Sequence, residues 1–389
     1  MKVVSLLIGL LSICCALPAQ EVISIGHKQS LASNILQEER EIWVYTPPEY
    51  ESGDTKFPVM YLLDGDGNFH HTTGLMNFLQ RENRMPPMIV IAVLNTNRTR
   101  DLTPKASGGD AIRFPDGGGA DQFLAFMADE LFPFVEKTYR TQPYRLLVGH
   151  SFGGLFAAHT ILNRPELFNA YIAISPSLWW DNQEQAKRSD AFFKDHQDLK
   201  GHFFMTMGNE GGDMLGGAWR FAASLEEHAG EHLKWDFVVM ETETHGSIPH
   251  RSTYQGLEFI FKDWFIEDPA RMLEEGGLLA FQDHYRKLSA QMGYEVKVPE
   301  QMTNQAGYHF LRKNEFDKAI DAFAQNVKDY PSSANVHDSA GDGYFAKGDY
   351  QKAKKHYAKA VDLAKKQMDD RLEAYEKNLE KVKQKLKNK

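Results

Sequence analysis

Apolar runs without polar interruption alternate with helically spaced apolar residues over the first 268 residues of this 389-residue chain. Strands that are apolar on both faces are typical of a parallel sheet covered by helices on either side. This alternation therefore predicts a three-layer α/β domain. The apolar runs lie at 57–64, 88–94, 144–148, 170–175, 202–207 and 234–240, after opening strands predicted at 21–27 and 39–46. Helical spacing is found at 121–139, with a predicted break near Pro133, and at 155–160, 184–198, 215–228 and 254–266.

The pattern changes after Asp268, where helical spacing rich in Lys and Glu replaces the strand-like runs. Residues 314–319 recur at 348–353, and this offset resembles the period of tetratricopeptide repeats, which we place at 299–366 after a helical linker at 269–298. Two such units are fewer than usual, so we expect a final helix at 367–389 to cap them. A dimeric coiled coil through the same helix is the alternative. Its apolar seam comprises Met368, Leu372, Tyr375, Leu379, Val382 and Leu386.

The first residues form a short positive start followed by an apolar run, which predicts a secretory signal peptide at 1–19. The α/β domain then spans 20–268. Both cysteines, Cys14 and Cys15, lie in the leader, so the mature chain has no thiol for catalysis or metal binding. We expect a periplasmic or secreted protein with no stable membrane span, and a lipid anchor at one of these cysteines is the weaker alternative.

The composition is that of a globular protein, with 42% hydrophobic and 25% charged residues. The net charge of −9 does not favour an electrostatic interaction with nucleic acid or anionic lipid.

The segment Gly149-His150-Ser151-Phe152-Gly153 lies between the strand at 144–148 and a helical segment. A strand, a sharp turn and a helix are the context in which a G-x-S-x-G sequence forms a nucleophile elbow. We therefore predict that Ser151 is a catalytic nucleophile. Gly149 and Gly153 are expected where a side chain would crowd the turn.

A serine nucleophile needs a base and a group that orients the base. His245 lies in a loop after the strand at 234–240, and we predict that it is the base; His250 is its nearest competitor. Glu210 follows the preceding strand and is the predicted acid. Asp213 is the alternative acid, and a Ser–His dyad oriented by a backbone carbonyl is a further one.

Backbone N–H groups of Phe152 and Asp66 are the predicted oxyanion donors, the second from a turn at 65–68. Trp179, Trp180 and Arg100 are the candidate substrate-binding residues, because they follow the same sheet edge or lie on the long loop at 95–119. Serine hydrolysis requires no metal or cofactor, and none is predicted.

Five segments in this order together resemble the putative-esterase (esterase D-like) family of α/β-hydrolases over about residues 25–268. They are 61–65, 100–104, 149–154, 175–180 and 244–246. The resemblance implies an α/β-hydrolase fold with Ser151 as nucleophile, His245 as base and Glu210 as acid. Family members include siderophore esterases, S-formylglutathione hydrolases, feruloyl and acetylxylan esterases and mycolyltransferases. The chain is most similar to the periplasmic siderophore-esterase type, and the predicted signal peptide argues against the cytosolic formylglutathione branch.

The sequence therefore predicts an exported serine carboxylic-ester hydrolase that acts through an acyl-enzyme on a small-molecule ester. Siderophore and acyl-carbohydrate esters are both open as substrates. An acyltransferase of the same fold is one alternative. A scaffold that binds a protein partner, or self-associates, through the helical repeats is another.

Overall fold

The computed structural model describes residues 23–51 and 53–388, so the predicted signal peptide lies outside the described residues. One eight-stranded sheet has the order β1-β2-β4-β3-β5-β6-β7-β8. The six strands from β3 to β8 are parallel to one another, whereas β2, next to the edge strand β1, is antiparallel to both β1 and β4. The strands are β1 (His27–Ser33), β2 (Glu38–Tyr45), β3 (Phe57–Leu62), β4 (Ile89–Val93), β5 (Thr141–His150), β6 (Ala170–Ile174), β7 (Gly201–Met207) and β8 (Leu233–Val239).

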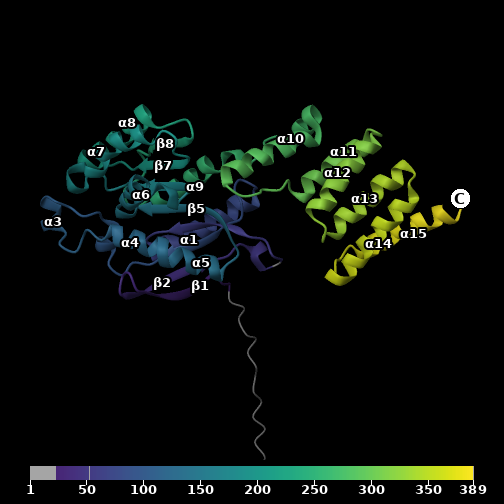
Figure 1. Cartoon of the computed structure of the whole chain (residues 1–389), viewed down its shortest axis with the longest axis horizontal. Coiled ribbons are helices and arrows are strands. Elements are labelled where there is room, and N and C mark those ends of the chain that lie inside the picture. The colour runs from purple at the N-terminus through teal and green to yellow at the C-terminus, as the bar shows by residue number, and fades with distance from the viewer. Residues whose placement is uncertain (1–22, 52, 389) are drawn as a thin grey trace, which may run out of the picture.

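Helices cover both faces of the sheet, as the apolar strands predicted (Figure 1). Buried side chains of α4 to α8 pack on one face, and those of α1 and α9 pack on the other. The α/β-hydrolase class predicted for this part is confirmed. The helices are α1 (Gly65–Arg81), α4 (Ala120–Phe126), α5 (Phe132–Thr138), α6 (Phe152–Asn163), α7 (Trp180–Asp195), α8 (Gly212–His228) and α9 (Ile248–Ile260).

Three local predictions differ from the structure. The first strand spans His27–Ser33 and follows residues 23–26, which are not in a strand; it was misplaced because an edge strand exposed along one side carries no apolar run. Residues 65–68 were predicted as a turn between elements, but they form the start of helix α1. The helix at 121–139 is not broken at Pro133, because a π-helical turn at Met127–Leu131 leads into α5, whose first turn accepts the proline.

Residues 269–387 form helices only. The pairs α11/α12 and α13/α14 are antiparallel neighbours, and the same tight contact recurs in each: a Cβ on Gly307 would lie 2.3 Å from Phe323, and one on Gly341 would lie 2.5 Å from Tyr357. The glycine and the aromatic residue of the second pair each follow those of the first pair by 34 residues, the same offset as in the sequence repeat. The helices are α10 (Pro269–Met292), α11 (Glu300–Arg312), α12 (Phe316–Asp329), α13 (Ala334–Lys347), α14 (Tyr350–Gln367) and α15 (Leu372–Lys387).

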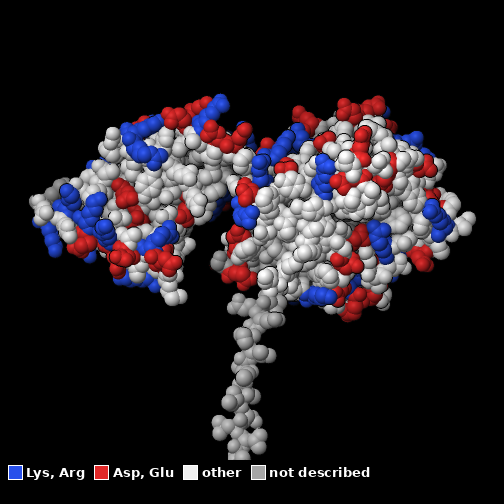
Figure 2. All heavy atoms as spheres, turned by 180° about the vertical axis from the view of Figure 1, so that it is seen from behind, with Lys and Arg blue, Asp and Glu red and all other residues white. Residues whose placement is uncertain are grey.

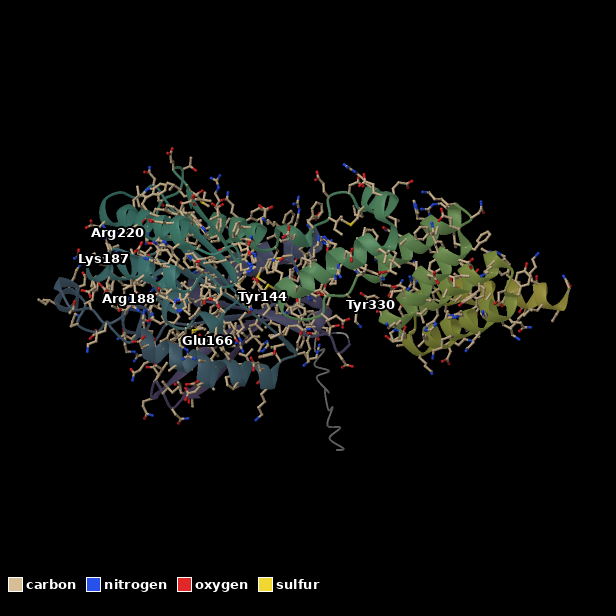
Figure 3. The ribbon with its side chains drawn as sticks, turned by 45° about the horizontal axis from the view of Figure 1, so that its top comes forward. Tyr144, Glu166, Lys187, Arg188, Arg220 and Tyr330 are labelled. Carbon is tan, nitrogen blue, oxygen red and sulfur yellow. The ribbon has the colours of Figure 1, made fainter. Side chains whose placement is uncertain are left out.

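Helix α10 joins the helical part to the sheet at the starts of the parallel strands (Figure 1). Met292 packs in one cluster with Tyr144 of β5 and with Phe261, which follows α9. Figure 3 labels Tyr144 at this junction. Gln291 Nε2 also donates to the carbonyl oxygen of Ile260 at 3.3 Å. The helical part is therefore attached at the edge opposite to the one where the parallel strands end.

Side chains of both charge signs are mixed over the two lobes on the face shown in Figure 2. Within the described part of the chain, every helix is too short or too polar to cross a bilayer.

Candidate active site

Ser151 lies between β5 and α6 in a backbone conformation that non-glycine residues rarely adopt, with φ 60° and ψ −113°. A Cβ on Gly149 would lie 2.3 Å from the carbonyl oxygen of Gly153, so this position requires glycine, as predicted. The same expectation for Gly153 is wrong, because a Cβ there would have ordinary contacts at 3.5 Å. Gly154 is the second tight position, 2.9 Å from Pro176. A strained serine on a glycine-lined turn is the geometry of a nucleophile elbow.

His245 and Glu210 are in direct contact. His245 Nδ1 lies 2.7 Å from Glu210 Oε2, and the Glu210 side chain is only 12% exposed. The two residues follow the ends of β7 and β8, which are adjacent in the sheet. The other carboxylate oxygen, Oε1, accepts a hydrogen bond from Ser175 Oγ at 2.6 Å, which fixes the orientation of Glu210. Asp213 lies exposed in the first turn of α8.

Ser151 Oγ lies 3.3 Å from Ser177 Oγ, and the backbone N–H of Ser177 donates to the Ser151 carbonyl at 3.0 Å. His245 lies beside the elbow, because its ring contacts that of His150, with 4.5 Å between the two ring centroids. Ser175 and Ser177 were not predicted as site residues. Their sequence signal was their position after β6, the strand adjacent to β5.

His150 is a half-buried residue beside the predicted base. Burial, together with the nearby His245, lowers its pKa to about 4. The imidazole therefore carries no charge at neutral pH. His150 also connects the elbow to a neighbouring loop, because its carbonyl oxygen accepts from Arg98 Nη2 at 3.0 Å.

The loop after β3 is fixed by Asp64, a left-handed residue (φ 52°) that precedes α1. Arg98 donates to both Asp64 oxygens, at 2.6 and 2.9 Å, and Asn95 Nδ2 donates to Oδ1 at 2.7 Å. N–H groups in the first turn of a helix have no intrahelical acceptor. The N-terminal turns of α1 and α6, with Asp66 and Phe152, therefore present free donors at the edge where β3 and β5 end.

The three predicted substrate-binding residues have different surroundings in the structure. Trp180 is only 1% exposed, and its Nε1 donates to the Pro104 carbonyl at 2.9 Å, so the binding role predicted for it does not fit. Trp179 is half-buried against Phe114 and Phe152.

Arg100 is held in an ion-pair network instead of being free for a ligand. Its guanidinium donates to both oxygens of Glu38, at 3.1 and 2.7 Å, and to Asp101 at 2.7 Å. Asp101 also pairs with the buried Arg40 at 2.8 Å. The binding role predicted for Arg100 therefore does not fit either. Arg98, two residues earlier on the same loop, is the arginine that contacts the elbow.

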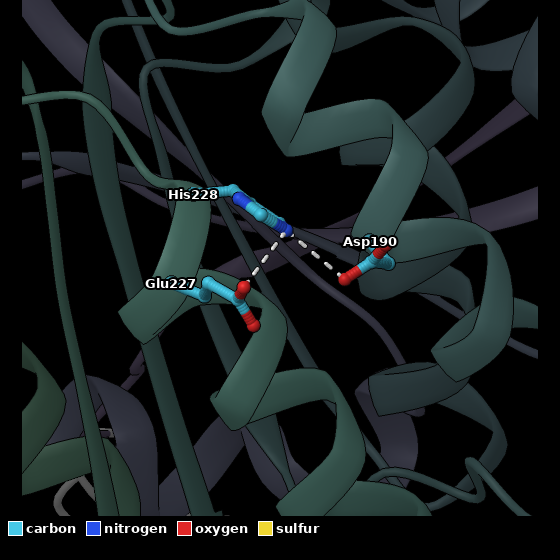
Figure 4. Close-up of side chains that lie close together, drawn as sticks. All are labelled: Asp190, Glu227 and His228. Carbon is cyan, nitrogen blue, oxygen red and sulfur yellow. Dashed lines mark hydrogen bonds and ion pairs between the residues drawn. The ribbon is translucent and has the colours of Figure 1, made fainter.

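Asp190, Glu227 and His228 form a group with metal-ligand spacing, their ligand atoms lying within 4.8 Å of one another (Figure 4). It lies on α7 and α8, and His228 Nε2 is 3.1 Å from Asp190 Oδ1. Both acidic side chains are exposed, and the group includes none of the predicted catalytic residues.

Residues 33–214 match the family described as "Putative esterase". A siderophore enterobactin esterase of Emericella nidulans is 37% identical over 157 residues, which cover 34% of this chain and 51% of that protein. Residues 33–214 of the α/β domain therefore resemble this esterase family. The ferri-bacillibactin esterase of Bacillus subtilis is 31% identical over 153 residues, covering 35% of this chain and 53% of that protein. The chain thus spans about half the length of these curated relatives.

The esterase domain also resembles solved structures. An IroE-like serine hydrolase from Shewanella oneidensis is 28% identical with a TM-score of 0.63, and the match covers 77% of this chain and 98% of that one. An uncharacterised protein from Capnocytophaga ochracea has a TM-score of 0.67 at 18% identity, covering 86% of this chain and 93% of that one. This second likeness concerns the fold alone and extends beyond the esterase domain.

Proposed function

We propose that this chain is an exported serine carboxylic-ester hydrolase that acts through an acyl-enzyme. The observation that carries the proposal is the 2.7 Å contact between His245 and Glu210 beside the strained turn at Ser151. A base held in one tautomer by a largely buried carboxylate, next to a half-buried serine on a strained turn, is the arrangement that activates a serine hydroxyl.

In the first half-reaction, Ser151 Oγ forms a bond to the acyl carbon and its proton passes to His245 Nε2. Glu210 accepts the hydrogen bond from His245 Nδ1, so that this proton stays on the imidazole ring, and its negative charge stabilises the imidazolium. The N–H groups of Phe152 and Asp66 donate to the oxyanion, and each such donor contributes about 3 kcal/mol to the transition state. His245 then protonates the leaving alcohol as the ester C–O bond breaks.

In the second half-reaction, His245 removes a proton from water as the water oxygen forms a bond to the acyl carbon. The bond between that carbon and Ser151 Oγ then breaks, and His245 returns the proton to Oγ, which releases the acid and regenerates the enzyme. Attack by Ser151 requires its hydroxyl to exchange the 3.3 Å contact with Ser177 for one with His245. Catalytic hydrogen bonds are often loose in unliganded enzymes and tighten when substrate binds.

The substrate class that we propose is an ester bond of a siderophore, because the two curated relatives described above are siderophore esterases. Acyl-carbohydrate esters form the second class to be tested. An acyltransferase would differ only in the second half-reaction, where an acceptor alcohol would take the place of water.

The test is hydrolysis of p-nitrophenyl butyrate, followed by a screen of ferric and iron-free catecholate siderophores and acetylated sugars. Ser151→Ala should lose hydrolysis while its circular dichroism spectrum stays that of the wild type. Ser30→Ala, on the exposed edge strand β1, is the matched control and should retain full activity. Hydrolysis of p-nitrophenyl butyrate by Ser151→Ala at the wild-type rate would refute the proposed nucleophile.

A further inference from the structure

Arg113 is an exposed cation that stands over aromatic rings at the end of the short helix α3 (Gly109–Arg113). Its guanidinium carbon lies 5.0 Å from the ring centroid of Phe114 and 5.6 Å from that of Trp179. Within residues 23–51 and 53–388, no carboxylate forms an ion pair with Arg113. A guanidinium packed over rings keeps its charge and directs its N–H edge outward.

These rings extend to the nucleophile. Phe152 directly follows Ser151, and its ring centroid lies 5.8 Å from that of Phe114 and 6.1 Å from that of Trp179. Arg98 also stands over Phe152, at 5.5 Å, but its charge is paired with Asp64. The half-buried rings of Phe114, Phe152 and Trp179, which we call the aromatic wall, therefore carry one paired and one unpaired arginine.

The segment that carries Arg113 is held in place before any substrate binds. The carboxylate of Asp181 accepts from the backbone N–H groups of Ser107 and Gly108, both at 3.0 Å. The N–H of Asp181 in turn donates to Asp110 Oδ2 at 2.9 Å. A preformed surface loses less entropy when a ligand is fixed against it.

We propose that Arg113 and the aromatic wall form a subsite for a planar, negatively charged group of the substrate beside Ser151. An aryl ring would stack on Phe114 and Trp179, and its anionic substituent would accept hydrogen bonds from the Arg113 guanidinium. This subsite rests on the function proposed above and specifies one chemical property of the ester that the site takes.

The test compares two esters of the same size that differ by one charge, 4-carboxyphenyl butyrate and 4-carbamoylphenyl butyrate. A second pair carries the same rings in the acyl part instead of the alcohol part. Its members are ethyl 3-(4-carboxyphenyl)propanoate and ethyl 3-(4-carbamoylphenyl)propanoate. The wild type should prefer the anionic member of one pair at least. Arg113→Gln should lower kcat/KM for that ester about tenfold, the typical loss for one charge-assisted contact, and leave the neutral ester within about twofold.

Arg188→Gln is the matched control, because Arg188 is an exposed arginine of α7 (Figure 3) whose Nη2 donates to Asn163 at 3.0 Å. This variant should change neither ester. Equal effects of Arg113→Gln on the charged and neutral members of both pairs, or no effect on any, would overturn the subsite. A wild type that hydrolyses none of the four esters or p-nitrophenyl butyrate would instead refute the proposed function.

Discussion

Glu210 and Asp213 are three residues apart, yet the structure gives them different surroundings. The Glu210 side chain is 12% exposed, contacts His245 at 2.7 Å and accepts a hydrogen bond from Ser175, whereas Asp213 is exposed in the first turn of α8. Loss of an acid that orients the catalytic base lowers kcat more than it changes KM, because the contact between acid and base strengthens as the imidazolium forms.

Glu210→Gln should therefore lower kcat for p-nitrophenyl butyrate by about 10³-fold to 10⁴-fold with a small change in KM. Asp213→Asn is the matched control and should keep wild-type kinetics. Both parameters come from initial rates at pH 7.5. If Asp213→Asn were the slower variant, the acid would be assigned wrongly; if both variants kept full activity, a Ser–His dyad would be indicated.

At this scale the sequence could place the residues that follow strand ends, because the ends of parallel strands meet at one edge. Ser151 was predicted from its G-x-S-x-G turn between a strand and a helix, and Glu210 and His245 were predicted from their places after strand ends. The supporting serines could not be assigned a role, because Ser175 and Ser177 have no motif chemistry apart from their position. Arg98 and Arg100 share one loop and one residue type, and only their partners, Asp64 and Glu38, distinguish them.

Among the elements, the ends of the buried strands were predicted within three residues, since an uninterrupted apolar run is a strong signal. The edge strand β1 was misplaced because its polar sequence alternates between exposed and half-buried residues. The start of α1 was taken for a turn, because Gly65 and Gly67 read as turn residues. A Cβ on Gly65 would approach Ala92 to 2.9 Å, so this glycine serves a close contact with β4.

From Leu372 onward the predicted apolar seam lies on α15 and packs on the helical repeats, as expected for a cap. Met368 instead follows the last residue of α14 and is 88% exposed. Val382 is fully buried against Ala353 and Tyr357 of α14, and Tyr375 packs on Ala360 and Ala364 of the same helix. A coiled-coil dimer through this seam would have to remove these contacts.

Val382→Ala should lower the free energy of unfolding of the helical part by about 2 kcal/mol, because two buried methyl groups are lost. Leu386→Ala, a half-buried position of the same helix, should cost less and serves as the control. Urea unfolding followed by circular dichroism measures both. Equal stability of Val382→Ala and the wild type would indicate that α15 does not pack as a cap.

On the scale of the whole molecule, the helical part and the candidate site lie at opposite edges of the sheet. Met292 and Gln291 contact residues near the strand starts, while Ser151, Glu210 and His245 follow strand ends. The charge and length of the sequence did not predict where the helical part is attached to the sheet. The attachment depends on the apolar cluster that Met292 of α10 forms with Tyr144 and Phe261.

Three histidines, one buried and two half-buried, make the free energy of unfolding depend on pH. Burial lowers the pKa of His71, His150 and His202 to about 4 from 6.5. Between these values the unfolded chain binds protons that the folded chain does not, so the free energy of unfolding falls as pH falls from about 6.5 to 4. Asp338 acts in the opposite sense, because burial raises its pKa to about 6 and protonation there favours the fold.

The melting temperature, measured by calorimetry, should accordingly be lower at pH 5.0 than at pH 7.5. His202→Gln should reduce that difference, since it removes one of the three groups, while His232→Gln at an exposed position should not. A melting temperature that stays constant or rises toward pH 5.0 would contradict the assignment of these histidines as neutral.

The central claim is that Ser151 is a nucleophile activated by His245, and covalent labelling tests it most directly. The full chain is incubated with a fluorophosphonate probe, and intact-protein mass spectrometry records the adduct. The account predicts one adduct, which peptide mapping places on Ser151, and none on Ser151→Ala. An unlabelled wild type, or labelling of Ser151→Ala to the same extent as the wild type, would contradict it.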